Sequence, residues 1–161
     1  MPPEEHQMKV AEFLKRSRQR PVTCGPDDTL EKAAKLLHKH CIGAMPVCAS
    51  GPESRMIGIV SERDLVRALA TDASRLPSMC VQDLMTAEVL SCGPDELMEN
   101  AQALMRTHHF RHLPVVEGDR LLGILSIRDT LASRLEESRI EINVLRDFAI
   151  AARCLPTEPV D

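Results

Sequence analysis

Apolar side chains recur at helical spacing in two stretches of the chain, residues 30–37 and 97–105. In the first stretch they fall at i, i+3, i+4 and i+7, the positions of Leu30, Ala33, Ala34 and Leu37. The second stretch has the same character, with Leu97, Ala101, Leu104 and Met105 on one side. This spacing gathers apolar groups on one helical face, so the sequence predicts two amphipathic helices.

Four short apolar runs predict strands, two after each of these helices. They are residues 44–48, 56–60, 113–116 and 121–125. Glu117-Gly118-Asp119-Arg120 separates the last two runs with turn-forming residues, which is typical of a tight hairpin. We therefore expect a small antiparallel sheet in each half of the chain.

Further helical patterns open and close each half. The opening turns are residues 10–14 and 81–85, and short extended pieces follow at residues 22–23 and 89–90. The closing helices follow the second strand of each half, and their apolar positions are Leu65, Val66 and Leu69, then Leu131 and Leu135.

The two halves repeat one another in sequence. Cys24-Gly25-Pro26-Asp27 returns as Cys92-Gly93-Pro94-Asp95, and Pro46-Val47 returns as Pro114-Val115 at the same offset. The first half is slightly longer, and its extra residues fall in the Gly/Pro/Ser-rich loop at 49–55, where insertion costs little. We predict an α/β (α+β) fold of two β-α-β-β-α units. The first half spans residues 8–72 and the second half 78–135, and their small sheets must pack on each other.

A third pattern extends past the repeat, over residues 136–154. Its apolar residues at helical spacing are Ile140, Val144, Leu145, Phe148 and Ala152. Such a stripe predicts a helix that docks on the body of the protein or on a second subunit, and we favour such docking over a free partner site. Residues 155–161 are predicted to form a frayed tail.

One motif occurs in both halves: glycine, two aliphatic residues, serine, any residue, arginine and aspartate. It covers residues 58–64 and 123–129. The layout predicts a strand that ends at the serine and a helix whose first turn carries the arginine and aspartate. Ser-x-x-Asp at a helix start is close to a capping box, but the same turn offers backbone N–H groups, a cation and a carboxylate to a phosphate and a ribose. The two interpretations are compatible.

Composition narrows the classes of function. Hydrophobic residues make up 43% of the chain and charged residues 27%, as in soluble globular proteins. Aromatic residues make up only 2%, which argues against the stacking platforms of nucleic-acid-binding proteins. The net charge of −4 gives no general attraction to nucleic acid or anionic membrane. Without a signal-peptide pattern or a run long enough to span a bilayer, we expect a cytoplasmic protein.

Cysteine and histidine residues raise the alternative of a metal site. The six cysteines are scattered without a C-x-x-C pair, so we interpret them as small buried hydrophobic residues in a reducing compartment. The histidine clusters are His38, His40 and Cys41, and His108, His109 and His112. Because both clusters fall where a helix ends, dipole complementation explains them better than zinc binding, and we predict no metal ligand. We also find no nucleophile elbow, Walker loop or H-E-x-x-H pattern, so we expect no catalytic residues.

The repeated motif, Arg111-His112-Leu113-Pro114-Val115-Val116 and the internal repeat together resemble the paired cystathionine-β-synthase (CBS) domains, also called a Bateman module. The resemblance covers residues 8 to 135 and extends to small stand-alone bacterial CBS-pair proteins. It implies a non-catalytic module for signal transduction that binds an adenine nucleotide, with AMP favoured and ATP, NAD(H) or S-adenosylmethionine as alternatives. It also implies a homodimer, with contacts at the helices after Asp64 and Asp129, that acts on an unknown effector protein.

The resemblance also suggests roles for particular residues. Asp64 and Asp129 match the aspartates that bind ribose hydroxyls, and Ser61 and Ser126 match the residues near ribose or phosphate. The matches to adenine contacts are Thr86 and Val89 in the second half and Val22 in the first, and the matches to phosphate contacts are Arg111 and His112, with Arg63 and Arg128 as further sources of charge.

The two halves differ at one of these places. Where the second half has Arg111-His112, the first has Gly43-Ala44. If each site is built from the residues of one half, the second half has more cationic groups near its aspartate. We therefore predict that the Asp129 site is the stronger one for a phosphorylated ligand. A structural homodimer without any ligand remains the alternative, because Ser-x-x-Asp caps stabilise helices regardless of binding.

Overall fold

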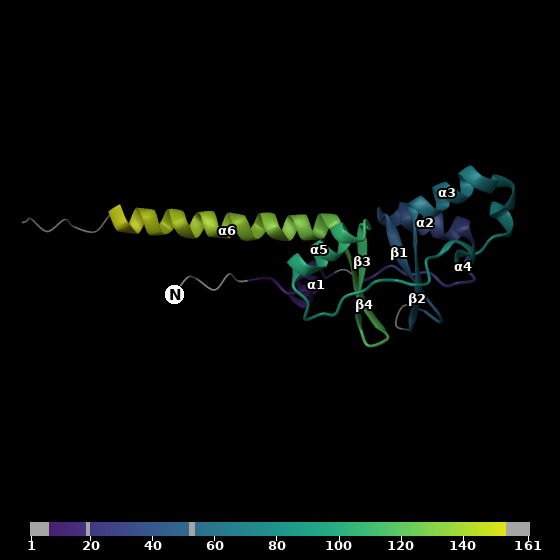
Figure 1. Cartoon of the computed structure of the whole chain (residues 1–161), viewed down its shortest axis with the longest axis horizontal. Helices are drawn as coiled ribbons and strands as arrows, with labels where there is room; N and C mark the ends of the chain where they lie inside the picture. Colours follow the sequence, from purple (N-terminus) through teal and green to yellow (C-terminus); the bar gives the residue numbers. More distant parts are fainter. Residues whose placement is uncertain (1–6, 19, 52–53, 154–161) are drawn as a thin grey trace, which may run out of the picture.

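A computed structural model describes residues 7–18, 20–51 and 54–153 of the chain. They form a body of two small sheets with helices around them, from which one long helix, α6, extends alone (Figure 1). The combination of helices with two small antiparallel sheets confirms the predicted fold class. The predicted tail at 155–161 lies outside the described residues.

From its long helix onward, the first half follows the predicted order of elements, but the extended pieces predicted at residues 22–23 and 89–90 form no strand, and only the nearby Cys24 and Cys92 make isolated bridges. Its elements are α2 (Leu30–His40), β1 (Ala44–Cys48), β2 (Met56–Ser61) and α3 (Glu62–Asp72). The two strands pair antiparallel with Met45 opposite Val60, and a single parallel bridge joins Cys24 to Val47. Helix α3 begins directly after β2, so the end of the strand and the start of the helix lie at one point.

The second half has the same arrangement. Its elements are α5 (Met98–Thr107), β3 (His112–Glu117), β4 (Arg120–Ser126) and α6 (Ile127–Arg153). Glu117 pairs with Arg120 across a two-residue turn, where Gly118 has a φ of 60°, and this confirms the predicted hairpin. Cys92 forms a parallel bridge with Val115, as Cys24 does with Val47.

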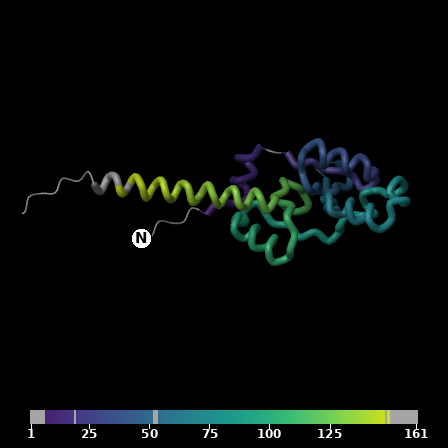
Figure 2. Tube along the Cα trace, turned by 90° about the horizontal axis from the view of Figure 1, so that it is seen from above, coloured from purple at the N-terminus to yellow at the C-terminus, as the bar shows by residue number. Residues whose placement is uncertain are grey.

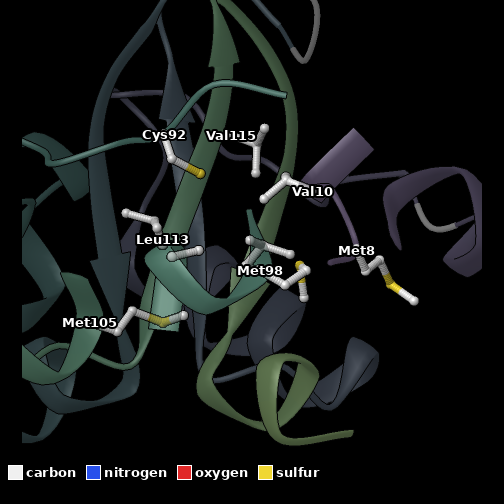
Figure 3. Close-up of a cluster of buried hydrophobic side chains, with 9 residues drawn as sticks. Met8, Val10, Cys92, Met98, Met105, Leu113 and Val115 are labelled. Carbon is white, nitrogen blue, oxygen red and sulfur yellow. The ribbon is translucent and has the colours of Figure 1, made fainter. Parts of the chain in front are cut away.

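The opening turns exchange places between the halves. Helix α1 (Val10–Ser17) packs into the core of the second half, where Met8 and Val10 lie with Cys92, Leu113 and Val115 (Figure 3). Helix α4 (Val81–Leu84), reached through the 3₁₀ helix η1 (Ala73–Ser78), instead packs into the core of the first half through Val81. Each half therefore completes its core with the opening segment of the other half.

Most predicted helix faces are buried. Leu30, Ala33 and Leu37 of α2 lie in the core, but Ala34 is exposed, so the prediction for that residue was wrong. In the second half, Leu97 precedes α5 as its N-cap and is not inside the helix. The core is almost free of aromatic groups and is built from methionine, aliphatic residues and cysteine.

Helix α6 does not dock on the body over its whole length. It runs unbroken from Ile127 to Arg153, and most of that length lies clear of the rest of the chain (Figure 2). Ile140 is 55% exposed and Leu145 68% exposed, so the predicted docking on the body is wrong, and docking on a second subunit stays a prediction. In the part of the chain that the structure describes, no helix combines the length and apolar character that crossing a membrane requires.

The described cysteines are all free. Cys24, Cys48 and Cys92 are buried in the cores, as predicted, but Cys41 is exposed. It caps the C-terminal end of α2 with a left-handed φ of 52°, so its position in the turn, and not packing, determines its exposure.

Candidate nucleotide-binding site

The two repeated motifs adopt one geometry at the starts of α3 and α6. The Ser61 backbone N–H and hydroxyl donate to Asp64 Oδ2 at 2.8 and 2.6 Å, and the Asp64 N–H donates to Ser61 Oγ at 3.4 Å. The corresponding distances between Ser126 and Asp129 are 2.6, 2.7 and 3.3 Å. Each motif is therefore a capping box in the structure.

The caps leave part of each carboxylate available. Among the described residues, both hydrogen bonds to Asp64 and both to Asp129 go to Oδ2, and neither Oδ1 accepts one. A carboxylate oxygen accepts hydrogen bonds from hydroxyl groups, and a bidentate acceptor suits the paired hydroxyls of a ribose. Capping thus leaves one oxygen of each side chain able to accept a further hydrogen bond.

One of the two aspartates, Asp64, lines a cavity that both halves of the chain form. This cavity has a volume of about 330 Å³, and Ser61, Arg63 and Asp64 form one side of it. The other predicted residues in its wall come from the second half: Thr86, Val89, Arg111 and His112. Its size falls in the range of small-molecule sites, about 300–1,000 Å³.

The exchange of opening turns brings Thr86 to this cavity. The Thr86 N–H donates to the Ile59 carbonyl at 2.9 Å, and the Ile59 N–H donates to the Thr86 carbonyl at 3.0 Å. Gly58 permits this approach, since a Cβ at that position would lie 2.6 Å from Met85 Sδ and 3.0 Å from the Thr86 carbonyl oxygen. The motif's glycine is therefore required by packing between the halves.

The cavity wall contains both apolar and charged side chains. Its apolar side chains are Ala44, Ile59, Val89, Leu90 and Phe110. Its cationic side chains are Arg63, Arg67 and Arg111, and Glu62 and Glu88 lie in the same wall. Sequence reasoning missed Arg67, although Arg63 and Arg67 are four residues apart and so share one face of α3.

His112 lies between the two motifs. A Cβ on Gly43 would be only 3.1 Å from His112 Cε1, so the small residue in the first half makes room for the imidazole of the second. Burial lowers the pKa of His112, and Arg111 and Arg128 lower it further, while Asp129 and Glu62 act in the opposite direction. Charged groups at the starts of both α3 and α6 therefore influence the pKa of His112.

Four predicted site residues do not line this cavity: Val22, Ser126, Arg128 and Asp129. Because they belong to the second half, Thr86, Val89, Arg111 and His112 were predicted to form one site with Asp129. In the structure, all four line the cavity that contains Asp64. Thr86 reaches the Asp64 cavity because the second half's opening segment pairs with the first half's strand β2, while His112 also pairs with Ser126 across β3 and β4. The only sequence signal for this exchange was the glycine inside the strand.

The histidine clusters do not assemble a metal site in the described residues. No group of three histidine, cysteine, aspartate or glutamate side chains is placed to hold an ion there. His109 and His112 line the cavity, while His108 stacks on Phe110 with 6.1 Å between ring centroids.

Comparisons with known proteins agree with this architecture. The CBS-domain sequence profile matches residues 10–71 and 81–136. CBSX3, a mitochondrial CBS domain-containing protein of Arabidopsis thaliana, is 31% identical over 78% of this chain, and the alignment covers 62% of its own length.

Solved structures of CBS-domain proteins are similar as well. The CBS-domain protein ATU1752 of Agrobacterium tumefaciens is 36% identical, with a TM-score of 0.73 over 79% of this chain and 99% of its own. The CBS-domain protein PAE2072 of Pyrobaculum aerophilum, solved in complex with AMP, is 30% identical with a TM-score of 0.66, covering 76% of this chain and 89% of its own. Since the profile matches both halves and the folds agree, the chain belongs to the CBS-domain family and carries two tandem CBS domains.

Proposed function

We propose that the chain is a regulatory module without catalytic activity that binds an adenine nucleotide, AMP above the alternatives, in the Asp64 cavity. One observation carries the proposal. The family's ribose, adenine and phosphate positions, as matched in this sequence by Asp64, Thr86 with Val89, and Arg111 with His112, line a single cavity.

In the proposed complex, each part of the nucleotide meets suitable groups. The ribose hydroxyls donate to Asp64 Oδ1, while Oδ2 keeps its capping role, and Ser61 lies beside the sugar. The adenine ring lies against Thr86 and Val89, which belong to the cavity wall together with several apolar side chains. The phosphate lies among Arg63, Arg111 and His112, because planar guanidinium groups bind phosphate oxygens in pairs.

The similarity to the AMP-bound PAE2072 protein supports AMP as the favoured ligand. The cavity volume of about 330 Å³ also supports a compact ligand. ATP, NAD(H) and S-adenosylmethionine remain the alternatives. A second site at Asp129, with Val22, Ser126 and Arg128, is proposed to be the weaker one, since Arg111 lines the Asp64 cavity.

We further propose that the chain acts as a homodimer on a separate effector protein. Exposed apolar residues on the closing helices support the dimer: Val66 and Leu69 on α3, and Leu131 and Leu135 on α6. The free cysteines fit the reducing cytoplasm, which we propose as the location.

The competing proposal is a structural dimer that binds no ligand. It is favoured by the complete capping boxes, because both Ser-x-x-Asp motifs have a stabilising role without any nucleotide. The two proposals differ in whether nucleotides stabilise the fold.

Thermal unfolding with AMP, ATP, NADH and S-adenosylmethionine tests the proposal. A ligand at one hundred times its dissociation constant adds about 2.7 kcal/mol to the free energy of unfolding, which gives a clear rise in Tm. We expect AMP to produce this rise in Tm in the wild-type chain. In the Asp64→Asn variant, most of the rise should be absent. If none of the four compounds raises Tm, the structural dimer is the correct alternative.

A further inference from the structure

Helix α6 continues well past the body of the protein. Its 27 residues span about 40 Å at 1.5 Å per residue. Beyond the body, Ile142 is 56% exposed and Leu145 68% exposed. A helix of this length is normally stabilised by burying an apolar face, so the exposed half of α6 needs a partner surface.

One face of α6 carries a heptad pattern from the body outward. Its positions are separated alternately by four and three residues and are Leu131, Leu135, Ser138, Ile142 and Leu145. We call these five residues the α6 seam. Alternating spacing of four and three is the a/d pattern of two helices that wind around each other. The seam therefore fits another helix better than a flat protein surface.

The seam does not face the body. Thr130 and Ser133 are buried at 3% exposure, and the Ser133 hydroxyl lies 3.3 Å from Met8 Sδ. Leu131 and Leu135, on a different face of the same turns, are 49% and 66% exposed. The body thus covers a polar face of α6 and leaves the four apolar seam residues exposed, while Ser138 borders a groove between α6 and the body.

The charges beside the seam indicate which helix fits. Taking Leu135 and Ile142 as a positions and Leu131 as a d position places Arg134 and Glu141 at g positions, which meet each other in an antiparallel pair. With Leu131 opposite the partner's Ile142, Arg134 lies beside the partner's Glu141, and symmetry repeats the contact. A parallel pair would instead place Arg134 beside the partner's Arg139.

From this complementarity we propose that α6 pairs with α6 of a second copy of the chain as an antiparallel coiled coil through the seam. The contact is isologous, so every attractive charge pair occurs twice. It lies outside the nucleotide cavity and does not depend on whether a nucleotide binds.

Sedimentation equilibrium of the full chain tests the proposal with a matched pair of variants. Ile142 is a seam residue, while Ile140 has nearly the same exposure, 55% against 56%, on the opposite face of the helix. We expect the wild-type chain at twice its 17.9 kDa mass. Ile142→Glu should weaken dimerisation at least about tenfold, because it places charge in the seam. Ile140→Glu should leave the dimer unchanged.

Equal effects of the two variants, or a wild-type monomer, would overturn the proposal. Both residues are exposed, so neither substitution disturbs the core, and unchanged AMP binding confirms that the variants are folded. A dimer that persists in Ile142→Glu would place the contact elsewhere, on α3 for example, without affecting the proposed nucleotide site.

Charge reversal tests the antiparallel arrangement. Arg134→Glu and Glu141→Arg should each weaken the dimer, because each places like charges side by side. The double variant restores opposite charges and should recover most of the wild-type affinity. If the double variant loses as much dimerisation free energy as the two single variants added together, the antiparallel pairing is wrong.

Discussion

Thr86 and Ile59 exchange two backbone hydrogen bonds, at 2.9 and 3.0 Å, although they belong to different halves of the repeat. This pairing fixes the start of the second half against the strand that leads to Asp64. The candidate cavity is therefore a product of both halves, and neither half alone contains the set of groups that we propose for adenine, ribose and phosphate.

Asp64→Asn should weaken AMP binding about 10- to 100-fold, since a hydrogen bond to a charged group contributes about 1.5–3 kcal/mol. Asparagine keeps an oxygen for the cap but puts an NH₂ group, which accepts no hydrogen bond, where Oδ1 would meet the ribose hydroxyls. Isothermal titration calorimetry measures the change.

Asp129→Asn is the matched control, because Asp129 has the same capping geometry but does not line the cavity. We expect it to change AMP affinity at the main site by much less. A larger loss in Asp129→Asn than in Asp64→Asn would restore the grouping that the sequence halves suggested.

Gly58→Ala should destabilise the fold by about 1–3 kcal/mol, because overpacking forces the backbone to move. The added methyl would lie 3.0 Å from the Thr86 carbonyl oxygen, which a rotamer change cannot relieve. The same movement should weaken AMP binding, since it displaces Thr86 and Val89. Urea unfolding and calorimetry measure the two effects.

The corresponding variant in the second half provides the comparison. A Cβ on Gly123 would meet only the side chain of Leu14, with Cδ2 at 2.7 Å, and the end of a leucine side chain can rotate away. Gly123→Ala should therefore cost less stability and leave AMP affinity close to wild type. Equal costs at both glycines would show that the Thr86 contact is not what limits residue size at Gly58.

The order of the elements was predictable because each depends on local spacing. Helix α2 follows from the placement of Leu30, Ala33 and Leu37, and the β3–β4 hairpin from the turn residues at Gly118. These signals act within a few residues along the chain. The start of α3 at Ser61 was likewise encoded by the capping box itself.

The grouping at the site was not predictable in the same way. Thr86 reaches Asp64 because α4 packs into the first core, and only the absence of a side chain at Gly58 hints at that approach. Internal repetition suggested that each half is self-contained. Long-range exchange between two similar units leaves no periodicity that a single sequence can reveal. The same limit applies to α6. The spacing of its apolar residues predicts a helix but does not identify whether the body or another chain covers them.

The cysteines should differ sharply in reactivity in the native protein. Burial raises the pKa of the Cys24 thiol to about 12 and that of Cys92 to about 11, so neither supplies thiolate near neutral pH. Cys41 is exposed at the end of α2. With a thiol-alkylating reagent and peptide mass spectrometry, we expect Cys41 to react rapidly and the two buried residues only after unfolding. Comparable native rates for Cys24 and Cys41 would contradict the burial of the first core.

His112 should make stability fall as the pH drops below about 6.5, the ordinary pKa of the side chain. Its folded-state pKa is lowered by burial and by Arg111, so the unfolded chain takes up the proton first and becomes favoured. The contribution of His112 to the free energy of unfolding is complete above pH 6.5. It is lost as the pH falls towards the lowered folded-state pKa. Urea unfolding of wild type and His112→Gln between pH 7.5 and 5 measures it, and the variant should show a shallower decline. His108→Gln, at an exposed histidine, should keep the wild-type slope, and an unchanged slope in His112→Gln would mean that the imidazole is already solvated.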